Sequence, residues 1–142
     1  MSLLLDSSIL VKLVVEEPSS HQARERVKES LKLGCILFTV DVALPEVLNA
    51  LWKHVKIHGD LDADEAERAA DDLMLLWDRM RILPSREVSL EALRIAFEKG
   101  LSVYDSLFLA ALEKTRSKLI TADKRLYEAS RGTVESELLQ EN

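Results

Sequence analysis

The chain is short of cysteine, glycine and aromatic residues, and each shortage excludes a class of protein. Its 142 residues include one cysteine, four glycines and only 5% aromatic residues. The single cysteine, Cys35, rules out an intramolecular disulfide framework, so we expect a reducing, cytoplasmic setting. Glycine-rich phosphate loops, the G-x-S-x-G pattern of serine hydrolases and the H-E-x-x-H pattern of zinc peptidases are all missing.

Long hydrophobic runs are missing as well. Asp6 and Lys12 interrupt the only apolar stretch near the amino terminus, so we expect neither a signal peptide nor a membrane-spanning helix. The 47% of hydrophobic and 31% of charged residues are typical of a soluble globular protein. The length predicts a single domain, residues 1–142, built around one core.

Excess positive charge is also absent, since the formal net charge is −6. A protein that binds nucleic acid mainly through its overall field is basic, which this chain is not. The objection is only partial, because a cluster of metal-binding carboxylates adds negative charge at the very place where a phosphate docks. Short basic stretches remain along the chain, and any one of them is also typical of a solvated helix end.

Short apolar runs alternate with helical patterns along the chain. Apolar runs over residues 2–5, 35–40, 81–83 and 118–121 predict strands, and the segments between them predict helices. This alternation favours an α/β domain with a mostly parallel sheet. A long helix predicted over 62–80 follows the helix over 44–58 with no strand between them, which indicates a helical layer or lid over one side of the sheet. The polar tail from Thr133 is compatible with a last strand or with a frayed end.

Two histidines on the helix over 44–58 are a weak metal signal. His54 and His58 are four residues apart and share a helix face, as zinc ligands often do. No third ligand is evident, however. The pattern therefore favours a solvated helix face.

Four acidic residues carry the strongest chemical signal. Asp6, Glu46, Asp105 and Asp123 each stand where an apolar run gives way to a helix start. In an open α/β sheet, the carboxyl ends of neighbouring strands face one crevice, so acids from distant parts of the chain can meet there. Crowded carboxylates repel one another unless protons or cations neutralise them. A hard divalent cation is their natural partner, and it leads to phosphate chemistry.

Each of these acids also has an ordinary structural interpretation. Asp6 and Asp123 are suitable helix caps, and Asp105 completes a capping-box pattern with Ser102. Glu46 in a first helical turn complements the helix dipole. The set is harder to explain in this way than any single member.

Four segments hold these acids, with the sequences LLLDSSILVK (3–12), LPEVLNAL (44–51), LSVYDSLFLAAL (101–112) and LITADKRL (119–126). In order, spacing and context they resemble the PIN-domain family, and most of all its small single-domain members, the VapC toxins of prokaryotic toxin–antitoxin pairs. The resemblance covers nearly the whole chain. No single motif is specific, but the ordered set is.

The resemblance implies a three-layer α/β/α sandwich with a mostly parallel central sheet. It also implies an endoribonuclease that depends on Mg²⁺ or Mn²⁺, with Asp6, Glu46, Asp105 and Asp123 as its catalytic and metal-binding acids. An RNA substrate, a cognate antitoxin protein and a homodimer follow as partners. The dimer would have Trp52 or Trp77 near a contact between helices.

Several supporting residues are expected around these acids. Ser8 and Thr121 lie two residues from Asp6 and Asp123 and are placed to orient them by hydrogen bonds. Asn49 matches a family asparagine one turn after Glu46, although a helix-surface amide explains it equally well. Arg125 stands where some relatives carry a further acid. The basic residues expected to position the RNA backbone at the rim are Lys12, Lys53 and Lys124.

Three rival functions remain. The first is a housekeeping RNA-processing nuclease that has the same site and no antitoxin. The second is a catalytically inactive PIN fold that serves as a protein-interaction module, and intact acids at all four positions argue against it. The third is a phosphatase of small phosphoesters, which the absence of a phosphate loop disfavours.

Overall fold

The computed structural model describes residues 1–132 and 135–140 of the chain. Five strands form one sheet in the order β3-β2-β1-β4-β5, and every strand is parallel to its neighbours. The strands are β1 (Ser2–Leu5), β2 (Ile36–Val40), β3 (Arg81–Leu83), β4 (Lys118–Thr121) and β5 (Ser136–Leu138). The predicted parallel sheet is confirmed, and the polar tail adds the edge strand β5.

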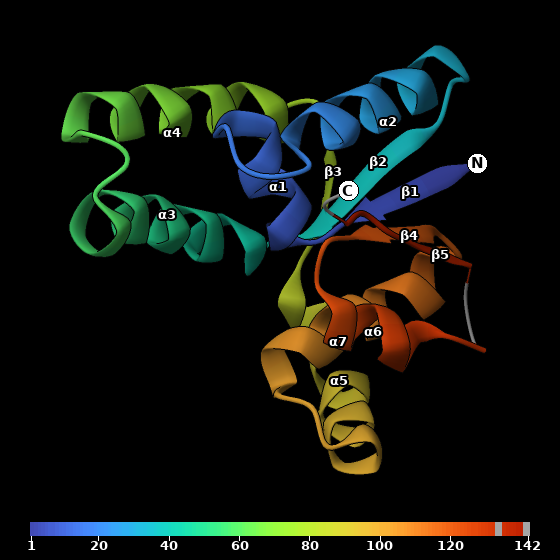
Figure 1. Cartoon of the computed structure of the whole chain (residues 1–142). Coiled ribbons are helices and arrows are strands. Elements are labelled where there is room, and N and C mark those ends of the chain that lie inside the picture. Colours follow the sequence, from blue (N-terminus) through green and yellow to red (C-terminus); the bar gives the residue numbers. More distant parts are fainter. Residues whose placement is uncertain (133–134, 141–142) are drawn as a thin grey trace.

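Helices cover both faces of the sheet (Figure 1). One layer holds α1 (Ser7–Val14), α2 (Ser20–Lys32), α3 (Ala43–Lys53) with its π-helical extension η1 (His54–His58), and α4 (Ala63–Trp77). The other layer holds α5 (Ser85–Lys99), α6 (Val103–Thr115) and α7 (Lys124–Ser130). This confirms the α/β/α sandwich. Among residues 1–132 and 135–140, the helices lack the combination of length and apolar character that a membrane span requires.

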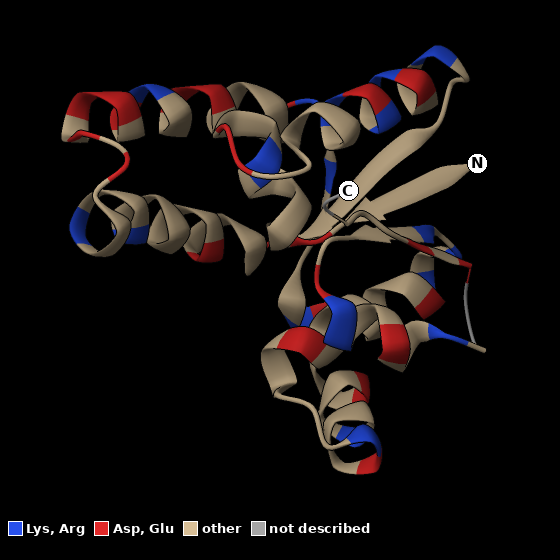
Figure 2. Ribbon diagram, in the orientation of Figure 1, with Lys and Arg blue, Asp and Glu red and all other residues tan. Residues whose placement is uncertain are grey.

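The core lies around the two central strands. Leu4 and Leu5 of β1, and Leu119 and Ile120 of β4, are fully buried. Strands in the middle of a parallel sheet are covered on both faces, which is why they consist of continuous apolar residues. Accordingly β1 and β2 carry no charged residue, whereas the helices around them carry many (Figure 2).

The path of the chain places the two central strands side by side although they are far apart in sequence. From β1 the chain moves outward to β2 and β3, and it then returns through α5 and α6 to β4 on the other side of β1. Leu5 of β1 is in register with Ile120 of β4. The direction of winding therefore reverses between β1 and β4, and the carboxyl ends of strands at such a switch point are where α/β folds bind ligands.

The long helix predicted over 62–80 ends earlier, at Trp77. It begins with a complete capping box, in which Asp62 accepts a hydrogen bond from the Glu65 amide and the Glu65 side chain accepts one from the Asp62 amide. Arg81 must enter the sheet beside Phe38, so the three residues before it form the turn into β3. The sequence pattern alone did not reveal this tertiary requirement.

The prediction of a solvated histidine face is wrong for His54. Its side chain is buried, its Nε2 lies 2.7 Å from Glu17 and its Nδ1 lies 2.8 Å from Asp60. The His58 ring stands edge-on to it, with ring centroids 5.4 Å apart. Glu17 also binds Lys12, at 3.3 Å. Because Glu17 lies in the α1–α2 connection, the helical pattern around His54 could not reveal this partner.

Replacing His54 by glutamine is expected to lower the free energy of unfolding, most strongly at acidic pH. Burial disfavours the charged ring, but the hydrogen bonds with Asp60 and Glu17 outweigh this effect and raise the pKa of His54. The folded protein therefore keeps this proton to a higher pH than the unfolded chain does. The stabilisation is complete below about pH 6.5 and is lost as the pH rises through the folded pKa.

Chemical denaturation from about pH 5 to about pH 9 measures this difference. The matched control is His21→Gln, because His21 is exposed on α2 and its replacement should change stability little at any pH. A penalty for His54→Gln that is constant across the pH range would show that the ring contributes packing alone.

Candidate active site

The four acidic residues singled out in the sequence all lie at the carboxyl edge of the sheet. Asp6 joins β1 to α1 and Asp123 joins β4 to α7, so these two follow the neighbouring strands of the switch point. Glu46 lies in the first turn of α3 and Asp105 in the first turn of α6. Acidic segments are accordingly visible where β1 and β4 give way to helices (Figure 2).

Asp6 is the most buried of the four and the best held. Only 3% of its surface is exposed. One carboxylate oxygen accepts hydrogen bonds from the Ser8 hydroxyl, at 2.6 Å, and from the Ile9 amide, at 3.2 Å, while the other accepts one from the Thr121 hydroxyl. The structure thus places Ser8 against Asp6, as the spacing predicts, whereas the Thr121 hydroxyl donates to Asp6 instead of to the carboxylate of Asp123, the acid two residues after it. Asp6 also caps α1.

Thr121 and Ser8 connect this acid to the loop that holds Asp123. The Asp123 amide donates a hydrogen bond to the Thr121 hydroxyl, and the Ala122 amide donates one to Ser8 Oγ, both at 2.9 Å. The Asp123 carboxylate accepts hydrogen bonds from the first turn of α7 and so caps that helix. The capping interpretation therefore holds for Asp6 and Asp123, and it does not conflict with a role in the site.

The pKa values of three of these acids show that the carboxylates affect one another. Burial raises the pKa of Asp6 to about 6, with a smaller contribution from the charge of Asp123. Burial also raises the pKa of Glu46, and the charge of Asp105 adds to this. The pKa of Asp105 is raised by burial and by Asp123, and it is lowered by Arg125. The four acids therefore form one connected group of like charges.

This group fits a divalent cation in chemistry, although the carboxylates do not already surround one point. Carboxylate oxygens are preferred ligands of Mg²⁺ and Mn²⁺, and a cation would relieve the repulsion between the carboxylates, which adds to the larger effect of burial on these pKa values. Within residues 1–132 and 135–140, no three His, Cys, Asp or Glu side chains are arranged to hold a metal ion. Asp6 is turned toward Ser8 and Thr121, and Glu46 is turned toward Ser7.

Sequence reasoning missed two residues of this region. The Ser7 hydroxyl donates a hydrogen bond to Glu46 at 3.2 Å and so ties α1 to α3. Arg125 supplies a positive charge near Asp105 and donates a hydrogen bond to the Gly100 carbonyl at 3.0 Å. The resemblance to the family implied an acid at this position in some members, and that expected departure was the available signal for Arg125. No local pattern marks Ser7, because its partner is 39 residues away.

The four remaining predicted residues differ in exposure and in polar contacts. Asn49, Lys53 and Lys124 are exposed, and none of them makes a side-chain hydrogen bond or ion pair within the described residues. Lys12 is instead nearly buried. Its ammonium group binds Glu17 at 3.3 Å and the Pro18 carbonyl at 2.7 Å.

A comparison with family models identifies this architecture. The model of the PIN domain matches residues 3–132, which include all four acids. The chain belongs to the PIN-domain family. The resemblance inferred from the four segments is thereby confirmed, and the match extends from β1 through α7.

Known relatives of this PIN domain agree with the assignment. Ribonuclease VapC3 of Pyrobaculum aerophilum is 35% identical over 128 residues, which cover 90% of this chain and 94% of the relative. Exonuclease VapC9 of the same organism is 29% identical, over 80% of this chain and 78% of the relative. A toxin–antitoxin complex from Klebsiella pneumoniae contains a chain with the same fold, with a TM-score of 0.68, 16% identity and coverage of 99% and 100%.

Replacing Asp6 by asparagine is expected to stabilise the metal-free PIN domain. Asparagine caps helices as well as aspartate does, and it avoids the burial of a charge that raises the pKa of Asp6 from 3.8 to about 6. A shift of that size corresponds to at most about 3 kcal/mol, so we expect a gain of about 1–3 kcal/mol at pH 7 in the presence of a chelator.

The pH dependence of this gain provides an internal test. The folded state holds the Asp6 proton to a higher pH than the unfolded state does, so metal-free stability falls as the pH rises from about 4 to about 6. The gain from Asp6→Asn should therefore shrink toward pH 4. The control Asp62→Asn changes the exposed cap of α4 and should have little effect. A large loss of stability in Asp6→Asn would show that the carboxylate serves only to hold the helix.

Proposed function

We propose that this PIN domain is a metal-dependent endoribonuclease and the toxin of a toxin–antitoxin pair. The observation that carries the proposal is the connected group of four carboxylates at the β1–β4 switch point. The similarity of this chain to ribonuclease VapC3, along nearly the whole length of both proteins, supports RNA as the substrate. A non-catalytic interaction module would have no need to keep buried, mutually repelling acids, which cost folding free energy.

In this proposal, Asp6, Glu46, Asp105 and Asp123 hold one or two Mg²⁺ or Mn²⁺ ions. Such an ion would supply an activated water and neutralise charge on the scissile phosphate. Ser8 and Thr121 keep the Asp6 carboxylate in one orientation through their hydrogen bonds. This preorganisation leaves the carboxylate little to rearrange when substrate and cation arrive.

Positive side chains around the acids contribute the contacts to RNA. Lys124 follows Asp123 at the start of α7, and Lys53 is the last residue of α3; both are exposed and can approach the phosphate backbone. Such contacts set the position and register of a nucleic acid without reading its sequence. Lys12 contributes its remaining N–H group from a position fixed by Glu17 and Pro18. Asn49, one turn after Glu46, is exposed, and its side-chain amide is a further group that can contact RNA.

The purified chain is expected to cleave single-stranded or looped RNA when Mg²⁺ or Mn²⁺ is present and to stop when EDTA is added. Asp105→Asn should reduce the rate by at least about a hundredfold, because even the partners of metal ligands are each typically worth roughly 10–100-fold. Ser8→Ala should reduce the cleavage rate by roughly 10–100-fold, because Ser8 is such a partner of Asp6. Gel analysis of labelled RNA measures both effects, and a circular RNA distinguishes internal cleavage from the exonuclease activity of VapC9.

Asp71→Asn, on the exposed surface of α4, is the matched control and should cleave at the wild-type rate. Thermal melting of each variant separates loss of chemistry from loss of fold. Cleavage that persists in EDTA and in Asp105→Asn would disprove the metal mechanism.

The proposed partners are a cognate antitoxin and a second copy of the chain, in the cytoplasm where the RNA substrate lies. Large apolar side chains left exposed on the helices support association, and they include Trp52, which is 53% exposed. Trp77, the other tryptophan predicted near a dimer contact, packs partly against the core of its own chain. Trp52 is therefore the better candidate for a contact between copies.

Expression of the chain alone is expected to arrest growth, and co-expression of the small protein encoded beside its gene should restore it. An antitoxin arginine can bind two carboxylate oxygens at once and would compete with the cation for them. Replacing the antitoxin's carboxyl-terminal arginines or lysines by alanine should weaken the complex. A chain that cuts RNA in vitro yet is harmless when expressed alone would favour the housekeeping nuclease.

A further inference from the structure

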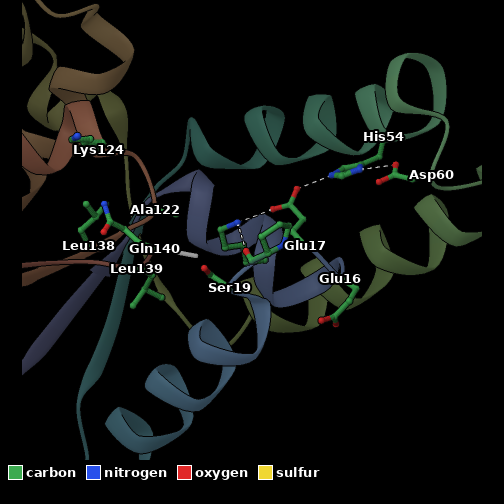
Figure 3. Close-up of a pocket in the computed structure, with 12 residues that line it drawn as sticks. Glu16, Glu17, Ser19, His54, Asp60, Ala122, Lys124, Leu138, Leu139 and Gln140 are labelled. Carbon is green, nitrogen blue, oxygen red and sulfur yellow. Dashed lines mark hydrogen bonds and ion pairs between the residues drawn. The ribbon is translucent and has the colours of Figure 1, made fainter. Parts of the chain in front are cut away.

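A cavity of about 690 Å³ lies between the α1–α2 connection on one side and the β4–α7 loop with the end of β5 on the other (Figure 3). Its volume is within the range of roughly 300–1,000 Å³ typical of small-molecule sites. One wall comes from Lys12, residues 16–19, His54 and Asp60, and the other comes from Ala122, Lys124 and residues 138–140. We call it the edge cavity.

The edge cavity lies directly beside the acidic group. Ala122, in its wall, stands between Thr121 and Asp123, and its amide donates a hydrogen bond to Ser8. Lys12 follows Ser8 by one turn of α1, a rise of about 6 Å. Lys124 follows Asp123. An RNA strand whose phosphate lies at the acids therefore has its next nucleotide within reach of this cavity.

Ion pairs hold one wall of the cavity in a fixed shape. His54 binds Glu17 and Asp60 (Figure 3). Lys12 binds Glu17 and the Pro18 carbonyl. The Ser20 hydroxyl accepts a hydrogen bond from the Glu17 amide and donates one to the Val15 carbonyl, both at 2.8 Å. Such rigid support is characteristic of a preorganised binding site.

Other polar groups of the cavity remain uncommitted. Within the described residues, Ser19, Lys124 and Gln140 make no side-chain hydrogen bond or ion pair, and Ser19 and Gln140 are drawn on opposite walls (Figure 3). Ser19 also has a positive φ of 69°. A residue other than glycine rarely adopts this conformation, and such residues cluster at functional sites. A hydroxyl and an amide, each able to donate and to accept, are thus available to a ligand.

The charges in the cavity suit a neutral ligand better than a phosphate. Its carboxylates already have cationic partners, since Glu17 pairs with Lys12 and His54, Asp60 pairs with His54, and Glu16 pairs with Arg24. A phosphate site would show an excess of unpaired positive charge. A nucleobase is uncharged and is recognised through hydrogen bonds to its polar edge, especially in single-stranded RNA.

The geometry points to a nucleobase subsite: the edge cavity binds the base next to the cleaved phosphate, and Ser19 and Gln140 read its polar edge. This inference rests on the proposed ribonuclease activity and deepens it, because it names where the sequence preference of cleavage is decided. Lys124, at the mouth of the cavity, contacts the adjoining phosphate or ribose. The cavity thus contributes selectivity, whereas the carboxylates contribute the chemistry.

The test uses short single-stranded RNAs that differ only in the bases on either side of one cleaved bond. The wild-type chain, with Mn²⁺, should prefer one base at one neighbouring position by about tenfold or more in kcat/KM. In the double variant Ser19→Gly, Gln140→Ala this preference should fall to about twofold or less. The loss on the preferred substrate should appear mainly as a higher KM, because contacts made equally in the ground and transition states are removed.

Both substitutions preserve the fold on physical grounds. Glycine adopts the backbone conformation of Ser19 without strain, so Ser19→Gly should keep or raise the melting temperature. Asp71→Asn, on the exposed surface of α4 and not among the lining residues of this cavity, is the control and should keep the wild-type preference. Asp105→Asn serves as the blank for contaminating nucleases.

The possible outcomes separate this inference from the function on which it rests. Metal-dependent cleavage with the same base preference in the wild type and the double variant would overturn the subsite while leaving the ribonuclease intact. The subsite would also be overturned if the double variant kept the base preference but bound the antitoxin more weakly. The cavity would then be a protein-docking site. Absence of metal-dependent cleavage by the wild type would overturn both.

Discussion

A carboxylate held out of water between two strands is the constraint on which the rest of this site depends. Asp6 is almost completely buried, and the cost of burying its charge is only partly offset by hydrogen bonds from Ser8, Ile9 and Thr121. Those bonds begin α1, fix the end of β1 and join it to the end of β4. Ser8 then holds the Ala122 amide and Thr121 holds the Asp123 amide. Losing the hydrogen bonds of the Asp6 carboxylate would therefore weaken both the loop after β1 and the loop after β4.

The proposed metal site and the edge cavity lie side by side at the carboxyl edge of the sheet but differ in charge. This difference favours a different ligand in each. The acids of the proposed metal site have few cationic partners and raise one another's pKa. In the adjoining edge cavity, the carboxylates are paired with lysine, arginine or histidine. Under the proposed function, a cation would be attracted to the first region, and an uncharged base would be accommodated by the second. A net charge of −6 is thus compatible with RNA binding, because local arrangement outweighs the overall field.

Much of the fold could be predicted from the sequence, because it depends on local patterns. Apolar runs marked four of the strands, and Ser102 and Gly100 marked the boundaries of α6 and α5. The interactions of His54 could not be predicted in this way. Its helix spacing is that of a surface residue, but Glu17 reaches it from a connection 37 positions away. The same holds for the early end of α4, which the pairing of β3 with β2 requires.

For the candidate site, the sequence by itself determined which residue types stand at strand ends and helix starts, because those positions follow from short-range periodicity and capping. It therefore identified the four acids and the hydroxyls of Ser8 and Thr121. Only the tertiary structure decided which of them meet: β4 returns beside β1, which brings Thr121 onto Asp6 across 115 positions. The edge cavity likewise arises only when β5 and the α1–α2 connection face each other. Such contacts are set by packing between distant segments, and no local pattern encodes them.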